Sequence, residues 1–303
     1  MPLRLPRVPP HHAGPQAWAG ELPQSLTMVR ATSSRLAKWG TQALWDVLSP
    51  HLPGLSIEVV ERMGSTNGEL VERLRVVASS GRSREVRADD LNPCLLVAEH
   101  QTQGRGRLGR AWESSAGASL TFSLSLPLQR ADWSGLSLAV GLCVAEALDP
   151  EGQHLGLKWP NDLWLRDGSH RKLGGILIEA LTVGQVRVAV IGIGLNIQPL
   201  GPSVAALSEV HPGATAPWAL AKLMPRLVQG LQAFDHTGFG GFVEAYAKRD
   251  ILRGRTLTTT DPGCLLGLAE GVDVDGALLL RGDAGPHRIV SGEVSVRPVQ
   301  VAY

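Results

Sequence analysis

A short stretch rich in glycine and arginine, QTQGRGRLGRAW over residues 101–112, constrains this chain more than any other segment. Glycine permits tight backbone turns, and successive N–H groups in such turns form a concave binding site for anions. Arginine adds a permanent positive charge and a planar set of donors that matches phosphate or carboxylate. The stretch therefore predicts a loop that closes over an anionic small molecule.

Arginine–glycine runs also occur in disordered RNA-binding segments, where they belong to long tracts of low complexity. In this chain the run lies between two apolar segments, Leu95–Ala98 and Leu120–Leu126, and both predict β-strands. We therefore expect a connection between two strands inside a folded domain.

The composition indicates a large core and little net charge. Hydrophobic residues make up 44% of the 303 residues, and the formal net charge of +1 argues against general binding to nucleic acids or membrane surfaces. The sequence contains no apolar run near the ~20 residues that a membrane span needs. Its three cysteines, Cys94, Cys143 and Cys264, form no Cys-x-x-Cys pair, so neither a zinc site nor a redox motif is expected. We expect a cytoplasmic protein with reduced thiols.

The chain divides into three parts. Residues 1–54 form an N-terminal extension, in which prolines predict a disordered start and one helix then follows from about Ser34 to Leu48. One helix is too little for a helix-turn-helix module, so no DNA-binding domain is expected. Residues 55–252 form the main domain. Residues 253–303 alternate short β-type segments with turn signals, which predicts a small β-barrel of the SH3 kind.

Three polar residues, Ser65, Thr66 and Asn67, stand between a predicted strand and a predicted helix. Thr66 and Glu69 fit a capping box, which is a purely structural role. A helix N-terminus with polar side chains also offers hydrogen bonds to a small polar ligand. Both interpretations stay open on this segment alone.

A second informative block spans residues 157–179. Residues 166–170 predict a hairpin turn, and the two strands that it joins bring Asp162 close to Lys172. The lysine stands beside a pair of glycines on a strand that soon becomes fully apolar. A salt bridge at a strand end and a functional lysine are both compatible with this pattern.

Residues 186–197 predict a further strand, which contains Gly192 and Gly194. The pair lacks the third glycine and the following helix of a dinucleotide-binding fingerprint. Glycines inside a strand permit the close approach of a backbone or a ligand. Asn196, at the end of the strand, is placed either to read the edge of a base or to form a turn.

Five motifs in a fixed order together resemble those of the biotin–protein ligases. They are Ser65-Thr66-Asn67, the stretch from Gly104 to Trp112, Lys158-Trp159-Pro160-Asn161-Asp162, Lys172-Leu173-Gly174-Gly175-Ile176, and Gly192-x-Gly194-x-Asn196. The resemblance covers about residues 57–298 and is to the bacterial class without an N-terminal repressor domain. Gly64 departs from the pattern, because family members often carry an acidic residue there.

The resemblance implies an α+β fold. In that fold a mixed sheet is flanked by helices, as in class II aminoacyl-tRNA synthetases and biotin ligases, and a C-terminal SH3-like β-barrel follows. The catalytic domain that binds biotin and ATP would occupy residues 55–252, and the barrel residues 253–303. Relatives dimerise through the sheet edge, so the resemblance also allows a homodimer.

The activity that the resemblance implies is that of a biotin–[biotin carboxyl-carrier protein] ligase. Biotin and ATP would give biotinyl-5′-AMP and pyrophosphate, and a lysine of a carrier domain, as in acetyl-CoA carboxylase, would then take the biotin. Mg²⁺ is expected to enter with ATP, bound largely through the phosphates, without a dedicated metal site in the protein. Neither DNA nor a membrane is an expected partner.

The matching positions receive roles from the resemblance. The residues expected to bind biotin are Ser65, Thr66, Asn67, Gln101, Arg105, Gly106, Arg107, Trp112, Lys172, Gly174 and Gly175. The residues expected at ATP or the adenylate are Gly104, Arg105, Arg107, Gly109, Arg110, Lys158, Asn161, Lys172 and Asn196. The residues expected to take part in catalysis are Lys172, Arg105, Arg107 and Asp162.

Some of these roles are specific. Lys172 would hold the oxygens shared by the carboxyl group and the α-phosphate, where negative charge builds up, and the loop that contains Arg105 and Arg107 would order over the ligand. Asn196 would contact the adenine. Asp162 would either help to bind Mg²⁺ or steer the incoming lysine.

Two other functions compete with this one. Lipoate–protein ligases share the fold and the lysine in outline, but their arginine-pair and triple-glycine signature is missing from this sequence. A biotin-responsive regulator that binds nucleic acid is disfavoured by the near-neutral charge.

Overall fold

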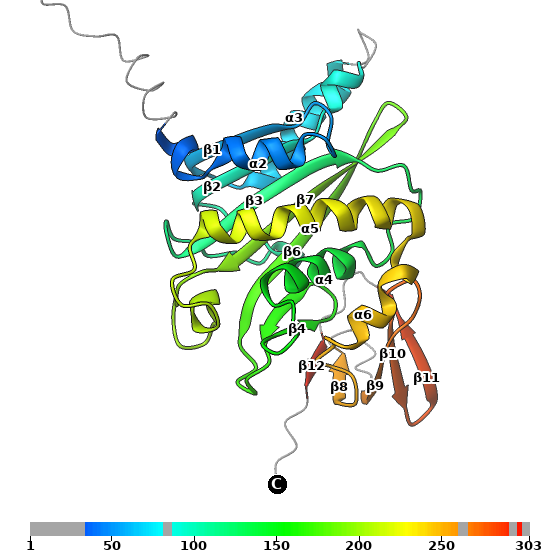
Figure 1. Ribbon diagram of the computed structural model, residues 1–303. Coiled ribbons are helices and arrows are strands. Elements are labelled where there is room, and N and C mark those ends of the chain that lie inside the picture. Colours follow the sequence, from blue (N-terminus) through cyan, green and yellow to red (C-terminus); the bar gives the residue numbers. More distant parts are fainter. Residues whose placement is uncertain (1–33, 81–86, 260–265, 291–295, 299–303) are drawn as a thin grey trace, which may run out of the picture.

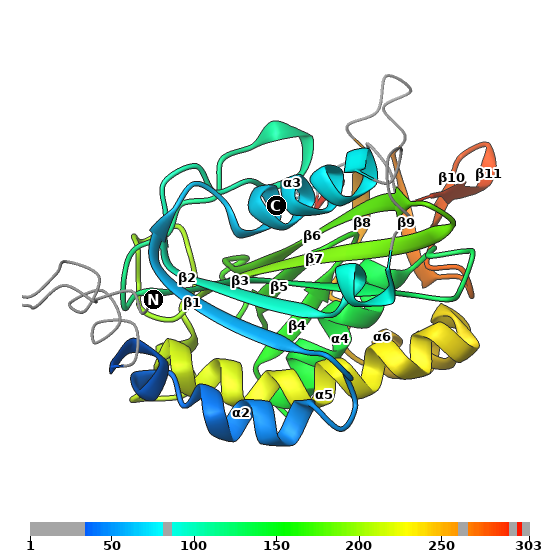
Figure 2. The same cartoon turned by 90° about the horizontal axis from the view of Figure 1, so that it is seen from above.

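The computed structural model describes residues 34–80, 87–259, 266–290 and 296–298. These residues form a seven-stranded sheet and a five-stranded sheet, with helices on both faces of the larger one (Figures 1 and 2). The disordered start predicted for the N-terminus lies outside the described residues. Within the described part, no helix combines the length and the apolar character that a membrane crossing requires.

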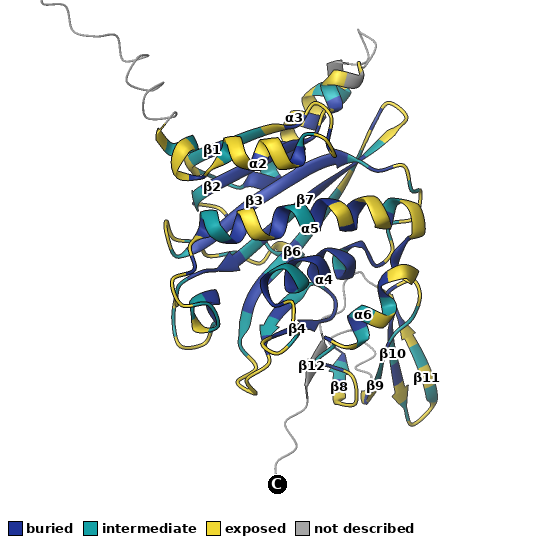
Figure 3. Cartoon of the chain, viewed as in Figure 1, coloured by how far each residue is buried: buried dark blue, intermediate teal, exposed yellow. Residues whose placement is uncertain are grey.

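The large sheet has the strand order β1-β2-β3-β7-β6-β5-β4, in which only β1 and β2 run parallel. Its central strands are buried on both faces (Figure 3). The strand β2 begins with a continuous apolar run, whereas β3 alternates apolar side chains with buried serine and threonine. The strands are β1 (Ser56–Met63), β2 (Cys94–Gln101), β3 (Ser119–Pro127), β4 (Leu155–Lys158), β5 (Asp162–Leu165), β6 (Lys172–Val183) and β7 (Val186–Asn196).

Helices pack on the two faces unequally. One face carries the helices α2 (Thr41–Leu48), α4 (Leu136–Leu148) and α5 (Ala216–Thr237), and the other carries α3 (Thr66–Ser80) (Figure 2). A short helix, α6 (Val243–Ala247), leads to the C-terminal sheet. Four 3₁₀ turns are also described, at Ala88–Leu91, Arg107–Gly109, Leu207–Glu209 and Phe239–Phe242.

The side chains of the sheet alternate between the two cores, as the period of a strand requires. Leu95 belongs to the large core under α4 and α5, whereas its neighbour Leu96 belongs to a smaller core under α3. Leu70 and Leu74 of α3 close that smaller core. The N-terminus of α3 thereby becomes fixed over the middle of the sheet.

The helix predicted to run unbroken to Leu48 is interrupted. Residues 34–38 are helical, but Gly40 adopts a left-handed conformation with φ of 60°, and α2 begins only after it. Glycine tolerates this conformation because it has no Cβ. Trp39 and Leu48 are buried in the large core, so this part of the N-terminal extension packs with the main domain.

The C-terminal sheet is antiparallel, with the order β11-β10-β9-β8-β12. This is the C-terminal β unit that the sequence predicted, and among the described residues its edge strands β11 and β12 are not paired with each other. Leu257 and Leu278 of this sheet join the large core of the main domain. The strands are β8 (Thr256–Thr259), β9 (Leu266–Val272), β10 (Leu278–Gly282), β11 (Gly285–Ile289) and β12 (Val296–Pro298).

Candidate functional site

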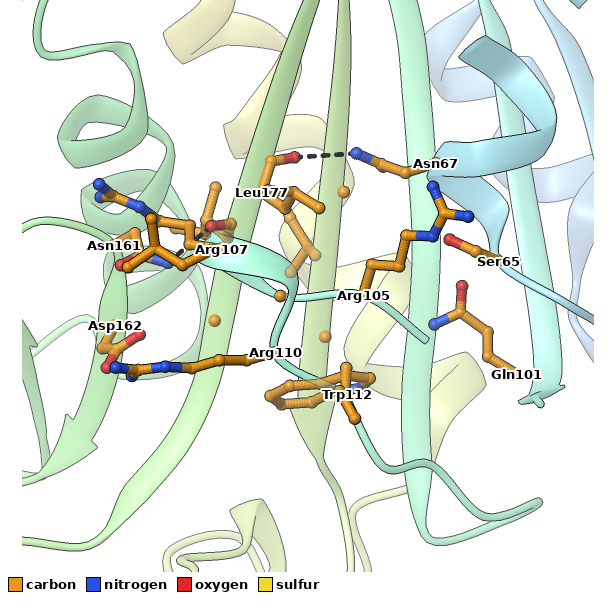
Figure 4. Close-up of a pocket in the computed structure, with 18 of the residues that line it drawn as sticks. Ser65, Asn67, Gln101, Arg105, Arg107, Arg110, Trp112, Asn161, Asp162 and Leu177 are labelled. Carbon is orange, nitrogen blue, oxygen red and sulfur yellow. Dashed lines mark hydrogen bonds between the residues drawn. The ribbon is translucent and has the colours of Figure 1, made fainter. Parts of the chain in front are cut away.

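A pocket lies on the sheet face that carries α3, between the start of that helix and the glycine- and arginine-rich stretch (Figure 4). Strands β3, β5, β6 and β7 supply its other walls. Fourteen of the predicted site residues line it: Ser65, Thr66, Asn67, Gln101, Arg105, Gly106, Arg107, Arg110, Trp112, Lys158, Asn161, Asp162, Lys172 and Gly175. Four others, Gly104, Gly109, Gly174 and Asn196, are not among its lining residues.

The start of α3 is held by a cap that differs from the predicted one. The Oγ atom of Ser65 accepts a hydrogen bond from the Gly68 N–H at 3.3 Å, so Ser65 is the capping residue. The Thr66 N–H donates instead to Oε1 of Gln101, at 2.6 Å. Thr66 is thus part of a polar cluster at one end of the pocket, and the capping box predicted for it is wrong.

The glycine- and arginine-rich stretch forms a small hairpin of its own. Arg105 and Ala111 form a β-bridge, and the Gly106 N–H donates to the Arg110 carbonyl at 2.7 Å. At the tip Leu108 has a left-handed φ of 56°. The hairpin directs the side chains of Arg105 and Arg110 along the pocket (Figure 4). The predicted connection between two strands is therefore present.

Two glycines of this hairpin shape the loop rather than the pocket. A Cβ atom on Gly104 would lie 2.3 Å from the carbonyl oxygen of Trp112, so only glycine allows the two backbones to come so close. Gly109 has a φ of 72°, which favours glycine on conformational grounds. Both glycines therefore set the conformation of the loop and do not line the pocket.

Lys172 and Asp162 face each other across neighbouring strands, as the hairpin predicted. The Nζ atom of Lys172 lies 2.7 Å from Oδ1 of Asp162 and 5.7 Å from the ring centre of Trp112. Lys158 is buried at the same end of the pocket, with its Nζ atom 5.1 Å from the centre of the Trp164 ring. Two ammonium groups thus stand beside indole rings, an arrangement that favours cations.

The pocket is strongly cationic. Five basic side chains line it against one carboxylate, that of Asp162: Arg105, Arg107, Arg110, Lys158 and Lys172. Burial lowers the pKa of the Arg107 guanidinium. The negative charge of Asp162 raises this pKa in part, and the positive charge of Arg110 lowers it further. An arginine remains charged at neutral pH even so. The site therefore suits a ligand with several negative charges.

The two glycines of β7 make room for side chains of the site. A Cβ atom on Gly192 would lie 2.3 Å from Oδ1 of Asn67, and one on Gly194 would lie 2.4 Å from the indole of Trp112. Within the protein the groups that approach these glycines are an amide and an indole, and both glycines also line the pocket. The sequence could not name these partners, since they come from distant segments.

Asn196 and Gly174 hold the framework behind the pocket. The Nδ2 atom of Asn196 is buried and donates to the carbonyl oxygens of Ala205, at 3.1 Å, and Lys172, at 3.4 Å. A Cβ atom on Gly174 would lie 2.4 Å from the side chain of Leu195. The structure therefore does not bring Asn196 to the pocket, where the predicted adenine contact would need it.

Several lining residues were not predicted as site residues. They are Leu108, Ala111, Phe122, Pro160, Ile176, Leu177, Gly192, Ile193 and Gly194. Most are apolar and lie on strands that the sequence did predict. Their apolar character alone does not distinguish a pocket wall from the core.

The described residues contain no group of three or more His, Cys, Asp or Glu side chains that could hold a metal ion. Asp162, the single carboxylate of the pocket, already pairs with Lys172. This donor set fits a metal ion that arrives bound to phosphate oxygens, and not one held in a protein cage.

Comparison with known families and proteins gives a consistent result. The model of the Biotin/lipoate A/B protein ligase family matches residues 84–196. The model of the Biotin protein ligase C terminal domain matches residues 256–297. The biotin–[acetyl-CoA-carboxylase] ligase of Mycobacterium tuberculosis is 34% identical over 256 residues, which are 77% of this chain and 85% of that protein. The bifunctional ligase/repressor BirA of Salmonella typhimurium is 32% identical over 268 residues, 84% of this chain and 78% of that protein.

Comparison with solved structures leads to the same family as the sequence comparison. The biotin protein ligase of Aquifex aeolicus, in complex with biotin and ATP, superimposes with a TM-score of 0.64 at 26% identity. The match covers 80% of this chain and 99% of that one. The sequence relatives show, and the mixed sheet and cationic pocket agree, that the chain belongs to the biotin protein ligase family.

Proposed function

We propose that this protein joins biotin to ATP as biotinyl-5′-AMP and then transfers the biotin to a lysine of a biotin carrier domain. The observation that carries the proposal is the Lys172 ammonium, held by Asp162 inside a pocket with four further cations. Such a pocket can bind a carboxylate and a triphosphate side by side. The family supplies the identity of the two substrates.

The pocket suggests how biotin lies in it. The polar cluster of Thr66, Asn67 and Gln101 suits the ureido ring, because amide and hydroxyl groups complement its N–H and C=O groups. The opposite end, with Lys172 and Trp112, suits the carboxylate and its aliphatic chain. In this pose the acid group of biotin is the part that meets the nucleotide.

The first step forms the mixed anhydride. A carboxylate oxygen of biotin attacks the α-phosphorus, the bond from that phosphorus to the bridging oxygen breaks, and pyrophosphate leaves. Lys172 and Arg107 stabilise the charge on the oxygens around the phosphorus, and Arg105 closes the loop over the product. Mg²⁺ that enters with ATP would neutralise part of the phosphate charge.

The second step transfers the acyl group. The amine of a carrier lysine attacks the acyl carbon, an amide bond forms, AMP leaves, and the amine loses a proton. This route needs no covalent bond to the ligase, which fits a pocket built from cations and amides. The acceptor we propose is a biotin carboxyl carrier domain of an acetyl-CoA carboxylase, in the cytoplasm.

Incubation with biotin, MgATP and a carrier domain tests this function directly. We expect the intact mass of the carrier to increase by one biotinyl group, at a single lysine. Lipoate in place of biotin should give no product. Modification with lipoate alone would assign the protein to the lipoate branch of the same family description.

We propose ligase activity without DNA binding, and the net charge of +1 supports this. Titration of duplex DNA at low salt checks it, because a true regulator would bind and lose affinity steeply as salt rises. A homodimer through an edge of the large sheet is a further proposal, and sedimentation of the protein with and without biotin tests it.

A further inference from the structure

Two polar side chains lie directly behind the polar end of the pocket without lining it. Ser123, on the central strand β3, is fully buried. Its Oγ atom lies 2.6 Å from Oδ1 of Asn67 and 2.7 Å from Oγ1 of Thr66. Glu179, on β6, accepts a hydrogen bond from Nδ2 of Asn67 at 3.0 Å. Both therefore contact residues that face the ligand.

The orientation of the Asn67 amide follows from its neighbours. Its NH₂ group has two acceptors within reach. They are the Leu177 carbonyl at 3.2 Å (Figure 4) and the Glu179 carboxylate at 3.0 Å. A flipped amide would place its oxygen against both of these acceptors. The Asn67 oxygen must therefore point to Ser123, the one donor that it has among the described hydrogen bonds.

This orientation fixes the hydroxyl protons as well. Each hydroxyl has one proton to donate. Ser123 must donate to the Asn67 oxygen, so the 2.7 Å contact with Thr66 requires Thr66 to donate to Ser123. Oε1 of Gln101 receives the Thr66 N–H at 2.6 Å. The Oγ1 atom of Thr66 also lies 3.1 Å from this oxygen, but its single proton goes to the shorter contact with Ser123. The protons run in one direction, from Thr66 through Ser123 and Asn67 to Glu179.

The consequence reaches the ligand. With its proton turned toward Ser123, the Thr66 hydroxyl presents only lone pairs to the pocket that it lines. With its oxygen held by Thr66, the Gln101 amide has its NH₂ group left for the pocket. A cyclic urea carries N–H donors on either side of a carbonyl acceptor, so it needs both kinds of group.

We propose that Ser123 and Glu179 are positioning residues that set the hydrogen-bond polarity of the ureido end of the pocket. They make Thr66 an acceptor for a ureido N–H group, although neither touches the ligand. This inference rests on the proposed function, because it takes biotin as the ligand. It adds two residues that no sequence motif of the site contains.

Calorimetric titration of biotin into the Ser123→Ala variant is the central test. Loss of the hydroxyl leaves the Asn67 oxygen buried without a donor and lets the Thr66 proton turn back to Gln101. We expect the dissociation constant of biotin to rise about tenfold or more. The dissociation constant of dethiobiotin, which keeps the ureido ring, should rise by the same factor. The KM for ATP and kcat at saturating biotin should stay within about twofold.

A matched control comes from the same strand. Ser125 is also a buried serine of β3, two residues further on, so its side chain points to the same face of the sheet. It pairs with Cys94 and Val190 at the small core, away from the pocket. Ser125→Ala should leave the affinity for biotin unchanged.

Glu179 provides a second variant that does not touch the fully buried core. Glu179→Ala removes one of the two acceptors of the Asn67 amide and should lower the affinity for biotin about threefold to tenfold. Glu179→Gln keeps an acceptor oxygen and should weaken biotin less than Glu179→Ala does. A merely structural role would change the melting temperature but not this order of affinities.

The outcomes separate the two levels of the proposal. Failure of the unaltered protein to bind biotin overturns both the proposed function and this inference. Adenylate formation by the unaltered protein, together with undiminished biotin affinity in Ser123→Ala and Glu179→Ala, overturns the inference alone. If the dissociation constant of biotin and the KM for ATP rise by the same factor, the inference is also overturned, because this result indicates a general disturbance of the sheet.

Discussion

The ammonium group of Lys172 and the carboxylate of Asp162 form an ion pair of 2.7 Å across two adjacent strands at the pocket. The pair is partly exposed, and the lysine also lies beside the ring of Trp112. Asp162 therefore fixes where the positive charge of Lys172 stands before any ligand arrives. This preorganisation is what charge stabilisation in a transition state requires.

We expect Lys172→Ala to slow the formation of the adenylate by about a hundredfold to a thousandfold, which is typical for the loss of one charge-stabilising donor. Biotin-dependent exchange of pyrophosphate into ATP measures this step. An unchanged melting temperature would show that the fold survives. A variant that keeps more than a tenth of the activity would contradict the role of Lys172.

Asp162→Asn distinguishes three roles for this carboxylate. If Asp162 positions Lys172, adenylate formation falls about tenfold and additional Mg²⁺ does not restore it. This is the result we expect from the ion pair. Restoration by Mg²⁺ would indicate a metal ligand instead, and a loss confined to the transfer step would indicate steering of the acceptor lysine.

Arg105→Gly removes a guanidinium from the hairpin that covers the pocket. The loss of charge-assisted hydrogen bonds should speed the release of biotinyl-5′-AMP by about tenfold to a hundredfold. The released anhydride then labels lysines of bystander proteins, which a streptavidin blot detects. The double variant Arg105→Gly/Lys172→Ala is the control, because it makes little adenylate to release. Full retention of the intermediate would rule out a covering role for this hairpin.

Gly194→Ala tests the space that β7 leaves for Trp112. The added methyl group would lie 2.4 Å from the indole, so the ring must move. We expect a loss of about 1–3 kcal/mol in the free energy of unfolding, as for other overpacked sites, together with weaker adenylate binding. Gly240→Ala is the control, because the nearest atom to its Cβ is 4.0 Å away. Chemical denaturation and calorimetry measure the two effects, and wild-type values would refute the role of this glycine.

The buried pair of Asp149 and Arg249 makes the stability depend on pH. Burial alone would raise the pKa of the Asp149 carboxyl, but the N–H groups of residues 153–155 and the Arg249 charge outweigh it and lower that pKa. The stabilisation is therefore present above about pH 4, the value of an unfolded aspartate, and it is lost as the pH falls through the folded pKa.

Arg249→Met should lower the free energy of unfolding by about 3–5 kcal/mol at pH 7, because it leaves a buried carboxylate without its charged partner. The difference from the unaltered protein should shrink as the pH falls below about 4. Arg281→Met is the control, because its pair with Glu270 is exposed and worth less than about 1 kcal/mol. A pH-independent difference in urea denaturation would contradict this account.

The sequence predicted the framework of the fold well, because its signals are local. Apolar runs such as Leu120–Leu126 marked the central strands, and the hairpin at residues 166–170 correctly brought Asp162 to Lys172. The segment Leu136–Leu148 forms a buried helix, and its nearly all-apolar composition is a local signal of the same kind. Periodicity and turn signals are sufficient for such features.

Other features depend on contacts between distant segments and could not be predicted. The amide of Asn67 is oriented by residues 110 and 112 positions further along the chain. Asn196 points back to the backbone of Lys172, although its position at a strand end also suited a ligand. The break at Gly40 is local, but a single glycine in a helical pattern does not reveal its φ angle.

Trp159 lies in the segment that also carries Lys158 and Asn161, and its indole N–H donates to the carbonyl of Gly276 at 3.0 Å, just before β10. In this short segment, Lys158 and Asn161 line the pocket, whereas Trp159 is hydrogen-bonded to the start of the C-terminal sheet. A terminal module transplanted from another ligase would have to offer a carbonyl at the same place. Because Trp159 stands between two residues that line the pocket, we expect a foreign C-terminal module without this carbonyl to disturb the pocket as well as the contact between the two parts.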